Sequence, residues 1–191
     1  SMELTRRDAA AALAAIGATG GVALGVRRTT EDGGPGDGAE GDGADPPSSG
    51  EALSDQAVRE AMTGVARTLY PDAVSGVDAF VDGLLDGRLD GSAHAEGIRA
   101  AVAEVESAAR SWYDAPVADL SPAERDDLLR ELGADVAEER PDGTTAERVR
   151  YYVVNELLLA LYSSPTGGEL VGIENPQGYA GGAESYRRGP R

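Results

Sequence analysis

The 191-residue sequence contains no cysteine and no lysine, and it has one histidine, one tryptophan and one phenylalanine. Without cysteine the chain forms no disulfide, has no thiolate nucleophile, and cannot ligate an iron–sulfur cluster or attach a c-type haem. Without lysine it lacks the cation of a P-loop and the amine of a Schiff base. One histidine excludes a metal site built from two or three histidines of one copy. We therefore expect no catalytic, cofactor-binding or metal-binding residue in this chain.

Positive charge is also scarce. The 17 basic residues are all arginine and face 34 acidic residues, which gives a net charge of −17 and a pI near 4.3. Such a chain repels nucleic acid and anionic lipid, because binding either requires neutralising phosphates. A hydrophobic fraction of 41% is typical of a globular protein, so the carboxylates are expected on the surface of a folded domain. A lysine-free, carboxylate-rich surface resembles proteins of salt-loving archaea, where salt screens the repulsion.

The first 28 residues have the features of an export signal. Thr5-Arg6-Arg7-Asp8 precedes an uncharged, Ala/Gly-rich run over residues 9–26. A paired arginine before a weakly apolar stretch resembles a twin-arginine signal, with Arg6 and Arg7 as the recognition pair, and predicts export to the extracellular face of the membrane or the cell surface. The run is close to membrane length, and both removal of the leader and its retention as an anchor are compatible with it.

Residues 29–53 are predicted to be a disordered acidic linker. Gly-Asp-Gly repeats, prolines and serines occur there with no large apolar residue before Leu53. This composition cannot bury enough surface to offset chain entropy.

Residues 54–164 show helical periodicity and predict an all-α domain. About five helices are expected, over residues 54–70, 75–85, 96–113, 121–136 and 145–162. Ser54 and Ser75 are predicted N-caps, and Ser121-Pro122-Ala123-Glu124 predicts a capping box. The last helix is apolar on nearly all sides from residue 151 to 161, interrupted by Asn155 and Glu156, and is expected to lie at the centre with the others packed around it.

Residues 165–191 are predicted to form a turn-rich tail that docks onto a partner. Glycines and prolines alternate there with apolar and aromatic residues, which need a surface to lie on. The predicted partner contacts are Tyr162, Pro165, Gly167, Gly168, Pro176, Gly178, Tyr179, Gly181 and Tyr186.

Two features could be taken for chemistry, and both have simpler explanations. His94 lies at a predicted helix entrance, where an exposed or capping role is favoured over that of a catalytic base. The repeat Asp82-Gly83, Asp86-Gly87, Asp90-Gly91 has a four-residue step. A calcium loop needs ligands at alternate positions, so this step favours a solvated acidic edge of one helix.

The order of these features resembles that of the gluconate 2-dehydrogenase subunit 3 family. The resemblance covers the leader and residues from about 54 to the C-terminus. It rests on the paired arginine, Leu69-Tyr70-Pro71, the helix from Val77 to Leu85, Asp119-Leu120-Ser121-Pro122, Leu161-Tyr162-Ser163-Ser164-Pro165, and Gly178-Tyr179 with Gly181.

The resemblance implies a non-catalytic small subunit that is exported together with a large flavoprotein. That partner is an FAD-dependent dehydrogenase of the glucose–methanol–choline type, and a cytochrome subunit carrying haem c often completes such complexes. The twin-arginine translocase would then be a second partner. Two other functions stay open on the sequence: a free-standing secreted helical adaptor of a halophile, and a hydrolase or metal enzyme that uses carboxylates alone.

Overall fold

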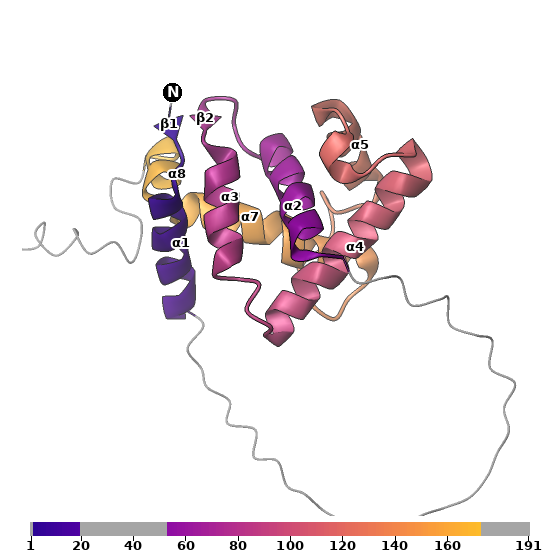
Figure 1. The fold of residues 1–191 in the computed structure, drawn as a ribbon, viewed down its shortest axis with the longest axis horizontal. Helices are drawn as coiled ribbons and strands as arrows, with labels where there is room; N and C mark the ends of the chain where they lie inside the picture. The colour runs from indigo at the N-terminus through magenta and orange to yellow at the C-terminus, as the bar shows by residue number, and fades with distance from the viewer. Residues whose placement is uncertain (1, 20–52, 173–191) are drawn as a thin grey trace, which may run out of the picture.

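A computed structural model describes residues 2–19 and 53–172, and the described chain is almost entirely helical (Figure 1). The all-α prediction is confirmed. The principal helices are α1 (Arg6–Thr19), α2 (Asp55–Leu69), α3 (Val77–Asp86), α4 (Ala93–Tyr113), α5 (Pro122–Glu131), α6 (Thr145–Val149), α7 (Glu156–Ser163) and α8 (Pro165–Leu170), with a 3₁₀ turn η1 (Val117–Asp119). Two short strands, β1 (Met2–Glu3) and β2 (Val74–Ser75), pair in parallel.

Helix α7 runs across the middle of the fold, as expected for the apolar C-terminal helix. In Figure 1 it passes behind α2 and α3, and α1 lies against it. The helical stretch from residue 145 to 163 is continuous, with a π-helical segment, η2 (Arg150–Asn155), between α6 and α7. Leu157, Ala160 and Leu161 are completely buried, whereas Leu159 and Tyr162 on the opposite side are exposed. The helix is therefore covered on one side only.

Helix α2 ends at the Leu69-Tyr70-Pro71 motif, and Tyr70 ties it to α7. The buried Tyr70 hydroxyl donates a hydrogen bond to the carbonyl oxygen of Leu157 at 2.9 Å. The ring meets Phe80 of α3 edge-on, with centroids 6.2 Å apart. Burial, together with the negative charge of Glu156, raises the pKa of Tyr70 far above its usual value.

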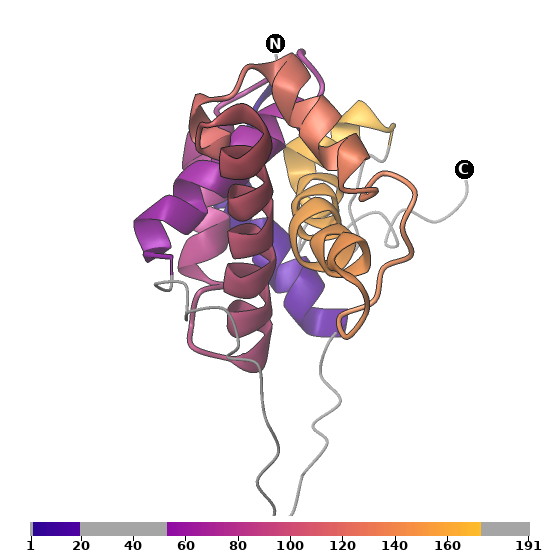
Figure 2. The same ribbon diagram turned by 90° about the vertical axis from the view of Figure 1, so that its right-hand side faces the viewer.

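The N-terminal segment is part of the core. Leu4, Ala9 and Ala12 are completely or almost completely buried, and α1 lies beside α3, α7 and α8 (Figures 1 and 2). The sequence predicts that residues 1–28 form a leader separate from the domain at 54–164. In the structure the described part of that leader packs against the domain instead. The predicted linker lies outside the described residues except for Leu53, which packs against the core.

The predicted cap Ser75 belongs to β2, and Gly76 is the N-cap of α3 instead. Gly76 has a left-handed backbone, with φ 76°. The Leu4 amide donates to the Ser75 carbonyl at 2.7 Å, and a Cβ on Gly76 would lie 2.0 Å from the Leu4 carbonyl oxygen. The N-terminal strand thus sets the start of α3, which periodicity within α3 cannot reveal.

Two large apolar residues within the helices predicted over 96–113 and 121–136 are exposed. Helix α5 stops at Glu131, because Gly133 adopts a left-handed φ of 75°, and Val136 beyond it is 83% exposed. Trp112, in the last turn of α4, is 48% exposed. The caps at Ser54 and Ser121 are present as predicted, the latter as a full capping box.

Two buried charges hold the turn between α4 and α5. The Val117 amide donates to Glu106 Oε1 at 3.2 Å, and Arg125 Nη1 donates to the Val117 carbonyl at 3.3 Å. Arg110 lies on the other carboxylate oxygen of Glu106 at 3.4 Å. Burial raises the pKa of Glu106 despite the Val117 amide and the Arg110 charge, which lower it. The Glu106 carboxylate therefore holds the turn in place, but the burial of its negative charge lowers the stability of the fold.

Candidate functional site

Tyr162 lies on the exposed side of α7. Among the predicted partner contacts in the described part of the chain, it is the exposed aromatic residue. Tyr162 is 45% exposed, and Leu159, one turn earlier, is 50% exposed. Val171, just past α8, is 51% exposed. We call these three residues the α7–α8 surface. Exposed apolar side chains that lie together mark surfaces that other proteins cover, and Leu159 and Tyr162, three residues apart on one helix, are candidates for such a contact.

The predicted turns at the start of the tail form helix α8 instead. Pro165 is its first residue, and the Ser164 hydroxyl caps it by accepting the Gly167 amide at 3.0 Å. A Cβ on Gly167 would lie 1.8 Å from the Leu161 carbonyl oxygen, so only glycine allows α8 to fold back on α7. Gly167 and Gly168 are buried, which corrects the expectation that they contact a partner directly.

Pro165 is half-buried at the start of α8. The other predicted contacts, Pro176, Gly178, Tyr179, Gly181 and Tyr186, lie outside the described residues. Val171 is one of the apolar tail residues expected to need a covering surface. Leu159 was not predicted, because an apolar residue in an apolar helix gives no sign of which side stays uncovered.

The two arginines of the predicted export signal lie in the first turn of α1. Both are exposed, and Arg6 forms ion pairs with two aspartates of α3, at 3.3 Å to Asp86 and 3.7 Å to Asp82. Arg6 of the predicted signal is thus in contact with the folded domain.

A charged cluster that sequence analysis missed surrounds Glu156, the first residue of α7. Its buried carboxylate lies 2.5 Å from Arg88 Nε and 3.1 Å from His94 Nε2. Ser92 caps α4, so His94 is held in the first turn of that helix rather than acting as a cap. The sequence feature that could have indicated this cluster is Glu156 itself, the one acidic residue between positions 151 and 161, where the helix is apolar on nearly all sides. A carboxylate between two basic side chains can hold both of them in place.

Tyr151 and Tyr152 pack against the same cluster. Their rings lie 6.2 Å and 5.3 Å from the His94 ring, centroid to centroid. A Cβ on Gly97 would lie 2.3 Å from the Tyr152 ring, so the tyrosine packs directly on the α4 backbone. The aromatic pair therefore has a packing role in the fold.

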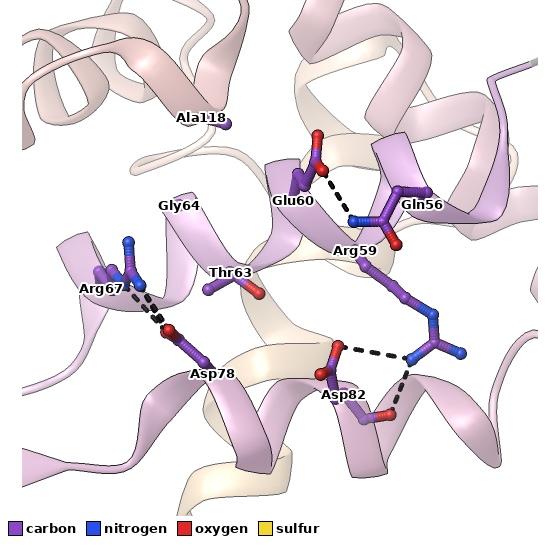
Figure 3. A pocket seen from close by; sticks show the side chains of 9 residues that line it. All are labelled: Gln56, Arg59, Glu60, Thr63, Gly64, Arg67, Asp78, Asp82 and Ala118. Carbon is purple, nitrogen blue, oxygen red and sulfur yellow. Dashed lines mark hydrogen bonds and ion pairs between the residues drawn. The ribbon is translucent and has the colours of Figure 1, made fainter.

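A surface pocket of about 280 Å³ lies between α2 and α3, away from the cluster (Figure 3). Its charged walls are already paired: Arg67 contacts Asp78 at 2.6 Å, and Arg59 donates to the Asp82 carbonyl at 2.9 Å. The pocket contains none of the three residues of the Glu156 cluster. Its arginines are engaged within the chain, which makes it a poor site for an anionic ligand.

Within residues 2–19 and 53–172, no three histidine or carboxylate side chains come together as metal ligands would. In the same ranges, none of the helices has the length and apolarity needed to cross a bilayer.

Comparison with known proteins gives one finding. The model of the family described as "Gluconate 2-dehydrogenase subunit 3" matches residues 57–181, from the first turn of α2 into the tail and without α1. No curated protein and no solved structure matches the chain. With a match over more than half of its length, including the α7–α8 surface, the chain belongs to the gluconate 2-dehydrogenase subunit 3 family.

Proposed function

We propose that this protein is the non-catalytic small subunit of an exported or membrane-associated FAD-dependent dehydrogenase. Its large partner is a flavoprotein of the glucose–methanol–choline type that oxidises a sugar or an alcohol. The observation that carries the proposal is the incomplete burial of α7 within the family region: Leu159 and Tyr162 are half exposed on the helix that forms the centre of the fold.

The function is that of an escort and stabiliser. A pair of folded proteins that crosses a membrane together must stay bound during transport, so its interface should exceed about 1,000 Å² and be apolar at the centre. The α7–α8 surface would provide that centre, and the tail beyond Gly172, with Tyr179 and Tyr186, would extend it. Arg6 and Arg7 would direct the pair to the twin-arginine translocase.

The cofactors of the complex would belong to the other subunits. FAD would be bound by the dehydrogenase subunit, and haem c by a cytochrome subunit that accepts the electrons. This chain has no cysteine for covalent haem attachment. The assembled complex would face the outside of the cell.

The test is co-purification of the flavoprotein with variants of the small subunit in the native host. Aspartate at Leu159 and Tyr162 together should abolish recovery of the flavin absorption, because two charges would be buried without partners. The matched control is Trp112→Asp, which places the same charge at an equally exposed aromatic position on α4. A second variant ends the chain after Gly172 and leaves α8 intact.

Undiminished flavoprotein recovery with the double aspartate variant would refute the assignment of the surface. A small subunit that never carries a flavoprotein, in any preparation, would instead favour the free-standing adaptor.

A further inference from the structure

Helix α1 is seated on a groove of α3 lined by glycine. A Cβ on Gly83 would lie 3.0 Å from the Ala9 Cβ, and one on Gly87 would lie 2.5 Å from Leu13 Cδ1. Each glycine inside a helix costs about 1 kcal/mol relative to alanine. Gly83 lies inside α3 and Gly87 is its C-cap, and the close approach of α1 that both permit explains the glycine at each position.

The aspartates of the same repeat hold the arginine of the export pair. Asp82 and Asp86 both lie within ion-pair distance of Arg6 and also of Arg59 from α2, whose Nη2 is 2.7 Å from Asp86. At its first two steps the Asp-Gly repeat contacts α1 while keeping the solvent exposure expected of an acidic edge, since the Asp82 and Asp86 side chains are 42% and 55% exposed. Its third step differs, because Asp90 accepts the Ser92 amide at the start of α4.

Asp8 fastens the same helix to α8. Its buried carboxylate accepts hydrogen bonds from the Thr5 hydroxyl at 2.6 Å and from the Thr166 hydroxyl at 2.8 Å. Burial alone would raise the pKa of Asp8, but these hydrogen bonds outweigh it and lower the pKa. The contact joins residues 158 positions apart, so α1 is held at both α3 and α8.

We propose that the groove formed by Asp82, Gly83, Asp86 and Gly87 is an intramolecular receptor for the export helix, and that α1 must leave it before the protein can be exported. The inference rests on the proposed export function. A translocase that reads the arginine pair and the apolar run needs Arg6 free of its ion pairs and Ala9 and Ala12 exposed. The docked helix is therefore an autoinhibited signal.

The contact is built to be reversible. The side chains of α1 that enter the fold deepest are alanines, which bury little apolar area each, so their share of the docking free energy is small. When α1 leaves, Arg59 still pairs with Asp82 and Asp86, so the vacated groove keeps a counter-charge.

Docking is measured by thiol labelling, since the natural chain has no cysteine. Ala12→Cys places the only thiol on the buried side of α1, and Ala10→Cys places it on the exposed side of the same helix. We expect the Ala12 thiol of the folded chain to react at least about 100-fold more slowly than the Ala10 thiol, because it reacts only after the helix detaches. Equal rates would overturn the inference, whatever export shows.

Release is forced by Gly83→Leu, which leaves the signal sequence untouched and favours helix formation in α3. The control is Ala79→Leu, at an exposed position of α3. Gly83→Leu should raise the Ala12 labelling rate at least about tenfold and Ala79→Leu should not. If circular dichroism shows that Gly83→Leu fails to fold, Thr166→Val replaces it and removes the hydroxyl bond to Asp8.

Export is measured with the same variants in the native host. Freed α1 should increase the rate at which the small subunit appears outside the cell, and an unchanged rate in a variant that labels quickly would overturn the autoinhibition. Arg6→Lys with Arg7→Lys should stop export in every background. Export that survives these lysines would refute the proposed export function and the gating with it, whereas slow Ala12 labelling would still establish the docked helix.

Discussion

Replacing Tyr70 with phenylalanine removes only the hydroxyl that joins α2 to α7. Near neutral pH the variant should be less stable by about 1 kcal/mol, the usual net value of a buried hydrogen bond between uncharged groups. The ring and its edge-on contact with Phe80 are kept, so no cavity penalty is added.

The order of stability should reverse at alkaline pH. An unfolded tyrosine ionises near pH 10, whereas burial holds the Tyr70 hydroxyl protonated in the folded chain well beyond that. This contribution to stability is complete below about pH 10, and is lost above it by about 1.4 kcal/mol per pH unit until the folded pKa is reached. Because phenylalanine does not titrate, the two stability curves should cross near about pH 11.

Urea unfolding followed by far-ultraviolet circular dichroism, at intervals from pH 7 to 11.5, measures the crossing. The chain suits this assay because it has neither lysine nor cysteine, so tyrosines dominate its titration in the alkaline range. The control is Tyr162→Phe, which removes an exposed hydroxyl and should stay within about 0.5 kcal/mol of the natural protein at pH 7. Curves for Tyr70→Phe and the natural protein that remain parallel through pH 11.5 would refute the reasoning.

Glu106→Gln keeps the acceptor for the Val117 amide and removes a charge whose burial is costly. Because the folded pKa of Glu106 is raised, its contribution to stability is complete below about pH 4.3 and is lost as the pH rises towards the folded pKa. Glutamine does not titrate, so the stability of the variant should decline less over this range. At pH 7 the two proteins should differ by no more than about 1 kcal/mol, since the acceptor for the Val117 amide is kept. Urea unfolding between pH 4 and 7 tests this, and a steeper decline in the variant would contradict it. Gly167→Ala should destabilise by more than the usual 1–3 kcal/mol of overpacking (about 3 kcal/mol or more), because the clash is with backbone. Amide hydrogen exchange of the Gly167→Ala variant should become faster first in α8. The control is Gly172→Ala, where a Cβ meets no atom within 4 Å, and it should cost about 1 kcal/mol. Equal losses of stability in the two variants would count against the fold of α8.

Most of the helical body could be predicted from periodicity and caps. The capping box at Ser121 and the apolar run ending at Leu161 mark their helices locally, and both are where the sequence places them. Local signals fail where a distant segment decides the structure. Gly76 replaces Ser75 as a cap because Leu4 arrives from the N-terminus, which no pattern around residue 75 records.

The candidate site was predictable in part for the same reason. Tyr162 could be chosen because an aromatic residue preceded a segment rich in turns. The exposure of Leu159 depends on which neighbours cover α7, and the burial of Glu156 depends on Arg88 and His94 from another part of the chain. Composition predicts that a charge within an apolar helix needs a partner, but only the three-dimensional arrangement identifies it.

The distance along the chain between the end of α1 and the start of α2 has a consequence for topology. Thr19 and Asp55 are separated by about 35 residues, and a stretch of that length can reach at most about 120 Å. The hydrocarbon layer of a bilayer is about 30 Å thick. Under the proposed export function, α1 on a tether of this length would reach the translocase while the other helices remain folded up to several bilayer widths away.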